Sequence, residues 1–135
     1  CQIPCGIYDD ELRVELIEEH ITTIEKSISQ LQSLSQASPA NYNQIVRWVD
    51  NKEHHAQEIQ DIVAAYFLAQ RIKVPETKTG EAWNSYVERL TILHQIQVAA
   101  MKAKQTADPS QVVALRSLAQ SFRKAYFGEK GTHGH

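Results

Sequence analysis

The sequence predicts an all-α protein built as an antiparallel four-helix bundle. Two observations support this fold: from residue 9 onward the chain is rich in Glu, Gln, Lys, Leu, Ile and Ala, and Gly and Pro occur at only a few places. The length of 135 residues fits one domain, 1–135. Within it we expect a distinct N-terminal segment at 1–8, four helices over 9–127 and a polar tail at 128–135.

The first helix is predicted by an apolar stripe. Asp9 or Asp10 can cap its start, and the helix should end near Leu34, where a Ser- and Pro-containing stretch begins. Apolar residues recur at spacings of four and three, the pattern of a helix that faces a bundle core. The expected core residues are Ile17, Ile21, Ile24, Ile28 and Leu31.

The second helix should follow the break at Pro39. Asn41 or Asn43 can start it, and the same rhythm of apolar residues carries it to about Ile72. A loop at 73–80, which contains Pro and Gly, ends it. The expected core residues are Ile45, Val49, Ala56, Ile59, Val63 and Tyr66.

The third and fourth helices complete the bundle. The third should run to about Thr106, and Asp108 as N-cap with Pro109 at the first helical position is a standard start signal for the fourth. Short connections between four amphipathic helices favour an antiparallel arrangement that buries all the stripes. The expected core residues are Trp83, Val87, Leu90 and Leu93 in the third helix, and Leu115, Leu118, Phe122 and Tyr126 in the fourth.

The composition also limits the partners. The formal net charge is −2 and no basic stripe is present, which argues against nucleic acid. The longest apolar runs, such as 62–69, are far shorter than the ~20 residues that span a bilayer, so no membrane partner is expected. No leader opens the chain, so it is made without one or has lost it, and we expect a cytoplasmic protein. Three aromatic residues beside the stripes, Trp48, Tyr86 and Phe127, favour a homo-oligomer.

The N-terminal segment carries the chemistry. Both cysteines of the chain, Cys1 and Cys5, lie here, and thiolates are soft ligands that suit nickel, copper or zinc. Pro4 restricts the loop between them and Gly6 permits a tight exit from it. A Cys1–Cys5 disulfide is the alternative, but so short a loop at a terminus would constrain the unfolded chain little. We therefore predict a metal-binding hook, the name used below for residues 1–8.

The hook resembles that of nickel-type superoxide dismutases, whose motif is His-Cys-x-x-Pro-Cys-Gly-x-Tyr. Weaker matches continue through Arg13-Val14-Glu15, Lys52-Glu53 and Tyr66-Phe67. The resemblance implies a homohexamer of four-helix bundles, one nickel per hook, and the disproportionation of superoxide to dioxygen and hydrogen peroxide. The residues that match the hook motif are Cys1, Pro4, Cys5, Gly6 and Tyr8.

The resemblance also assigns roles to single residues. Cys1 and Cys5 are the implied thiolate ligands, and Tyr8 is implied to line the site. Thiolates help to bring the nickel couple into the range that disproportionation needs. Tyr66 is a second candidate for the site, although a place on the second helix's stripe also fits a core tyrosine.

One departure from the motif is the leading His, which has no counterpart before Cys1. Either the mature chain carries one more residue or another group completes the ligand set. We select His55 over its neighbour His54 as a metal ligand, because it matches the family segment that packs near the hook, and Glu15 as the helix-one carboxylate that steadies an imidazole there. Two other functions stay open: a copper-dependent enzyme on the same fold, and a non-catalytic metal-binding or delivery protein.

Overall fold

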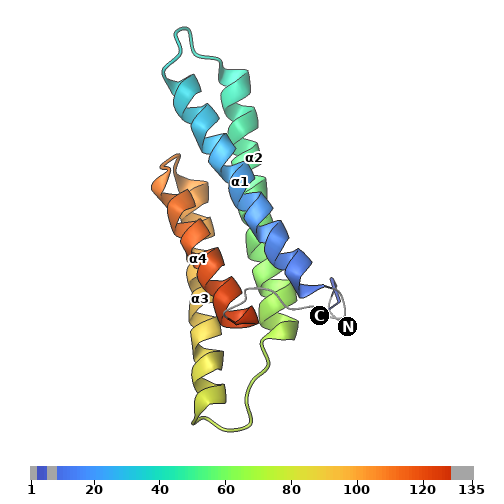
Figure 1. Ribbon diagram of the computed structural model, residues 1–135. Helices are drawn as coiled ribbons and strands as arrows, with labels where there is room; N and C mark the ends of the chain where they lie inside the picture. The colour runs from blue at the N-terminus through green and yellow to red at the C-terminus, as the bar shows by residue number, and fades with distance from the viewer. Residues whose placement is uncertain (1–2, 6–8, 129–135) are drawn as a thin grey trace.

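The computed structural model describes residues 3–5 and 9–128 and forms an up-down-up-down bundle (Figure 1). Each helix packs on its two neighbours in the order α1–α2–α3–α4–α1, which confirms the predicted all-α bundle. The predictions for Cys1, Tyr8 and most of the tail lie outside the described residues. The elements are α1 (Asp10–Ser35), α2 (Tyr42–Asp61), η1 (Ile62–Arg71), α3 (Glu81–Gln105) and α4 (Ser110–Phe127).

At three helix starts, a side chain that the sequence predicts as a cap accepts a backbone hydrogen bond. The side chains of Asp9, Asn41 and Asp108 each accept a hydrogen bond from a backbone N–H two or three residues later, at 2.9–3.3 Å. These bonds satisfy donors that the first turn of a helix leaves without a partner. Pro39 lies outside the helices, where its missing N–H costs nothing. The fourth helix begins one residue later than predicted, at Ser110, so Pro109 is its N-cap instead of its first residue.

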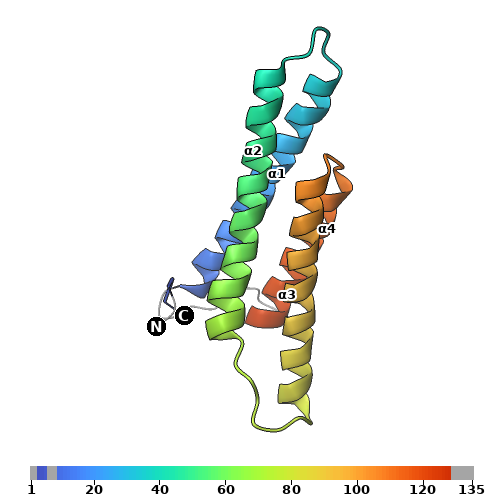
Figure 2. The ribbon, with the colours of Figure 1, turned by 180° about the vertical axis from the view of Figure 1, so that it is seen from behind.

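The core lies where all four helices overlap. The five core residues predicted for α1 are all buried, as are seven of the fourteen predicted for the other helices. Five more are only half-buried: Ile45, Trp83, Leu90, Leu118 and Tyr126. The prediction that Val49 is a core residue is wrong, because 37% of its surface is exposed. The ends of α1 and α2, where it lies, project beyond the α3–α4 pair (Figures 1 and 2). The same prediction for Val87 is also wrong, because 42% of its surface is exposed. In Figure 1, α3 begins below the other helices, after the 72–80 loop. Phe127, expected beside the core, is buried.

The second helix is continuous to Arg71, but its last ten residues, η1, wind as a π-helix. Hydrogen bonds in such a helix join residues five apart, as between the Ile72 N–H and the Phe67 oxygen at 2.9 Å. Residues five apart therefore lie on one side of η1. Ile62 and Phe67 are both buried, and Tyr66 and Arg71 both reach Asp10 of α1.

One lysine connects α2 to the far end of α3. The Lys52 ammonium is buried and donates to the main-chain oxygens of Ala103, Lys104 and Thr106 at 2.7–2.9 Å. These carbonyls are among those that the last turn of a helix leaves without partners.

No helix in the described part of the chain is both long and apolar enough to cross a bilayer.

Candidate metal centre

The described hook residues, 3–5, lie at the end of the bundle where α1 begins and η1 ends, which we call the hook end (Figure 1). Gln70 of η1 donates a hydrogen bond from its amide nitrogen to the Pro4 oxygen. The same amide donates to the oxygen of Ala65, 3.0 Å away. Cys5, next to Pro4, is half-buried. The hook is thus attached to η1 beside one of its predicted ligands.

A buried polar cluster occupies the hook end. Its centre is Asp10, the first residue of α1, of which only 4% is exposed. Tyr66 donates its hydroxyl proton to Oδ1 of Asp10. Oδ2 accepts from Nε and Nη2 of Arg71 at 3.1 and 2.9 Å, and from the Tyr126 hydroxyl at 2.8 Å. We call these four residues the Asp10 cluster, and it joins α1, η1 and α4.

The cluster fixes its own protonation state. Burial by itself raises the pKa of Asp10, but the hydrogen bonds from Tyr66, Tyr126 and Arg71 outweigh it and lower the pKa below the usual range. Burial, and then the hydrogen bond to Asp10, raises the pKa of Tyr66 far above that of a free phenol. The pKa of Tyr126 is raised for the same reasons. At neutral pH Asp10 is therefore an anion, and both tyrosines keep their protons.

The predicted ligand His55 lies away from the described hook residues within one chain. It precedes Gln70 by fifteen residues of continuous helix, about 20 Å along the axis. Its Nδ1 lies 2.8 Å from Nδ1 of His20 on α1, so one ring donates a hydrogen bond to the other. His54 points to solvent, with its Nε2 3.8 Å from Glu58. The role of His55 as a ligand stays a prediction.

The other two predicted site residues in the described part of the chain, Glu15 and Tyr66, differ in their surroundings. Glu15 is exposed on α1. Tyr66 reaches the hook end, but its side chain is fully buried and its hydroxyl is bound to Asp10. Sequence reasoning missed Asp10, Arg71, Gln70 and Tyr126 as partners. The only signal for Asp10 was its place after the hook, where it was considered as a helix cap.

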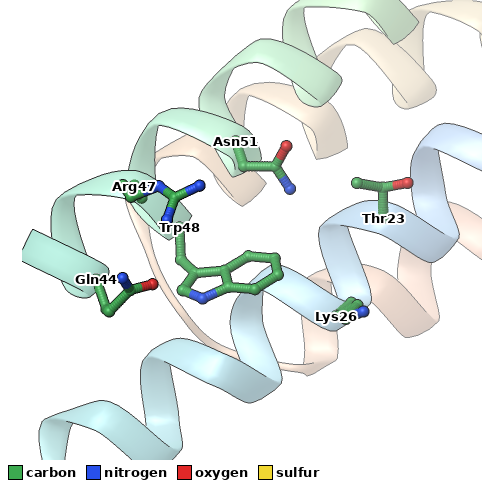
Figure 3. A pocket seen from close by; sticks show the side chains of 6 residues that line it. All are labelled: Thr23, Lys26, Gln44, Arg47, Trp48 and Asn51. Atoms are coloured by element: carbon green, nitrogen blue, oxygen red, sulfur yellow. The ribbon is translucent and has the colours of Figure 1, made fainter.

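A separate polar pocket of about 450 Å³ opens between α1 and α2 (Figure 3). The Trp48 ring forms one wall, and the Lys26 ammonium lies 5.9 Å from the ring centre. Its lining contains no thiol, imidazole or carboxylate, so it offers no typical metal ligand. The lining residues are Thr23, Lys26, Gln44, Arg47, Trp48 and Asn51.

Among residues 3–5 and 9–128 no group of three or more His, Cys, Asp or Glu side chains is arranged to hold a metal.

Similarity to known proteins is found at the level of the protein family. The family model described as nickel-containing superoxide dismutase matches residues 1–130. No curated protein and no solved structure matches the chain significantly.

Proposed function

Because the chain belongs to the family of nickel-containing superoxide dismutases, we propose that residues 1–8 are its catalytic hook and 9–127 the bundle that supports it. The family match covers nearly the whole chain, so the protein is a superoxide dismutase with a nickel cofactor. It converts superoxide to dioxygen and hydrogen peroxide. Neither a copper enzyme nor a metal-delivery protein is favoured by this match.

The donor chemistry of the hook fits nickel. Cys1 and Cys5 provide two thiolates, which are strong, soft donors and lose their protons on binding metal. In support, Cys5 is half-buried, and the carbonyl of its neighbour Pro4 is held by Gln70. This attachment is the observation that carries the assignment. It supports Cys5 as a ligand, because the residue beside Cys5 is bound to the packed bundle.

Nickel, when bound, supplies the electron transfer in which one superoxide is oxidised and the next is reduced. The chain has to position the hook and to deliver protons to the peroxide. Tyr66 is poorly suited to proton release, because its hydroxyl is buried and its pKa is raised by burial and by Asp10. We assign the proton supply to Tyr8, the hydroxyl nearest to Cys5 in sequence, together with water. Tyr66 then acts by holding Asp10.

A homohexamer is the assembly we propose, in keeping with the resemblance of the hook. The projecting ends of α1 and α2 support it, since Tyr42 and Val46 there are 75% and 57% exposed. In an assembly, Glu15 and His55 can serve the hook of a neighbouring subunit, because His55 lies about 20 Å along the helix axis from Gln70, which binds the described part of its own hook. The proposed compartment is the cytoplasm, where thiols stay reduced until they bind metal.

The test of the hook is Cys5→Ser. This change removes one thiolate and keeps the side-chain size, so bound nickel should fall from one per chain to a small fraction, and dismutase activity to that of the metal-free protein. Nickel content by mass spectrometry and superoxide decay measure the two. Far-UV circular dichroism is the control and should not change, because the four apolar stripes do not depend on the hook. A variant that keeps one tightly bound nickel would refute the proposal.

A further inference from the structure

Asp10 makes more bonds than the start of a helix requires. The capping bond of α1 is made by Asp9, whose Oδ1 accepts from the Glu11 N–H at 2.9 Å. Asp10 points inward instead, where its carboxylate receives four hydrogen bonds from side chains of η1 and α4. A buried ion pair is on average no more stabilising than apolar residues of the same volume. Stability alone is therefore a weak reason for the Asp10 cluster.

The bonds do fix a geometry. Both carboxylate oxygens of Asp10 are held by donors in set directions, so the carboxylate cannot turn. The start of α1 is thereby fixed relative to η1 and α4. Asp10 follows the hook by two residues, so the point at which the hook joins the bundle is fixed as well.

A second attachment of the hook is made by Gln70, the residue before Arg71 in η1. Gln70 binds the Pro4 oxygen, and Arg71 binds Asp10. Two consecutive residues of η1 thus hold the chain on either side of Cys5, at Pro4 and at Asp10. The five-residue step of the π-helix contributes, because it puts Tyr66 and Arg71 on the same side, where both reach Asp10.

We propose that Asp10 is a positioning residue for the nickel site. By tying the start of α1 to Tyr66, Arg71 and Tyr126, it holds the hook in place on η1 so that the thiolates meet before metal arrives. The inference rests on the proposed function, since it requires that the hook holds nickel. Partners that orient metal ligands from outside the ligand set typically contribute 10–100-fold to metal affinity.

The test is Asp10→Asn, with Asp9→Asn as its matched control. Both remove one negative charge beside the hook. Asn at 10 turns an NH₂ group toward either the Tyr66 hydroxyl or the Arg71 guanidinium, whereas exposed Asn at 9 can still accept from the Glu11 N–H. We expect the Kd for Ni²⁺, measured by competition with a chelator, to rise at least about tenfold in Asp10→Asn. In Asp9→Asn it should stay within about twofold of the parent.

A second control separates positioning from stability. Lys52→Met removes a buried charge far from the hook, and it should lower the stability of the metal-free protein without changing the Kd for Ni²⁺. If Lys52→Met weakens nickel binding as much as Asp10→Asn does, or if Asp10→Asn binds like the parent, the inference is wrong. The proposed function would still stand in both cases, because Cys5→Ser tests it separately.

A milder variant covers the case in which Asp10→Asn does not fold. Tyr126→Phe removes one hydrogen bond to Asp10 and keeps the ring packed on Phe67 and Phe122. It should raise the Kd for Ni²⁺ by several-fold, while Tyr86→Phe, a half-buried tyrosine on α3 outside the cluster, should leave it unchanged. Equal nickel affinity in the two variants would overturn the inference.

Discussion

Asp10 and Lys52 are both buried charged side chains, 4% and 3% exposed, but their partners differ in kind. Among the residues that the structure describes, Lys52 binds main-chain oxygens at the end of α3. The last turn of every helix has carbonyl oxygens without a partner within the helix, and Lys52 supplies hydrogen bonds to those of α3. The carboxylate of Asp10 accepts from side chains in the bonds described, and each of those side chains had to be supplied at its own position in η1 or α4.

The difference indicates what each charge is for. As a cap on α3, Lys52 only has to reach the last turn of the helix. Its loss should therefore lower the free energy of unfolding and change nothing else. A carboxylate held by three side chains from two elements fixes the orientation of the start of α1. Its loss should therefore appear in the position of the hook and in the nickel affinity. Three predictions test this contrast on the metal-free protein, in order of the size of the expected effect.

Lys52→Met should have the largest effect on stability. The oxygens of Ala103, Lys104 and Thr106 lose a charged donor, and leaving such groups buried without partners lowers the free energy of unfolding by about 3 kcal/mol. Urea unfolding followed by circular dichroism measures it. The control is Lys102→Met, which is exposed on α3 and should change stability by less than about 0.5 kcal/mol. A loss under about 1 kcal/mol would show that water replaces the ammonium.

Tyr66→Phe should have a smaller effect. It removes one hydrogen bond to Asp10 but keeps the ring against Phe67, 5.0 Å away between centres, so the expected loss is about 1–1.5 kcal/mol. Combined with Lys52→Met, the two losses should add within about 0.5 kcal/mol, because the sites share no partner and are well separated along the helix. A clear departure from additivity would mean that the two buried charges form one network, contrary to the comparison above.

Much of the fold could be predicted from the sequence because it is local. The stripe of α1 and the caps at Asp9, Asn41 and Asp108 depend on residues a few positions apart, and all are confirmed. The errors at Val49 and Val87 have one cause. An apolar residue at the right phase is buried only if a partner helix is present at that height, and a sequence stripe does not specify where partners end.

The hook end was beyond prediction for a physical reason. Tyr66 and Arg71 meet Asp10 because η1 winds with a five-residue step, and the pattern of spacings of three and four predicts an ordinary helix there. Tyr126 joins from more than one hundred residues away in the chain. The two cysteines, in contrast, stand out by composition and position, so a metal-binding hook could be predicted from the sequence. The contacts that Pro4 and Asp10 make with η1 and α4 could not.

The smallest expected effect is a dependence of stability on pH, and it distinguishes the two charges in a different way. Hydrogen bonds lower the pKa of Asp10 below its unfolded value of about 3.9. A group whose pKa is lowered on folding contributes stability that is present above its unfolded pKa and is lost as pH falls through its folded pKa. The Asp10 contribution should therefore disappear only below about pH 3.9. Lys52 stays protonated throughout the acidic range, so it should add no step there.

The His20–His55 pair should produce an earlier step. Burial, and then the neighbouring imidazole, lowers the pKa of both rings: His55 acts on His20, and His54 acts on His55, partly opposed by Glu58 and Glu19. The Nδ1–Nδ1 hydrogen bond also needs one ring atom without a proton. By the same sign argument, this stability is present above about pH 6.5 and is lost as pH falls below it.

Unfolding free energies measured from pH 8 to pH 3 should thus show two separate losses in the metal-free parent. His55→Gln should remove the upper one, and Asp10→Asn should reduce the lower one. A part of the lower loss should remain, because hydrogen bonds from Ser110 also lower the pKa of Asp108. Lys52→Met should lower the whole curve and keep both, because its charge does not change over this range. If the Lys52→Met curve instead loses the lower step, the two buried charges are coupled. The assignment of Lys52 to folding alone and of Asp10 to the hook would then have to be given up.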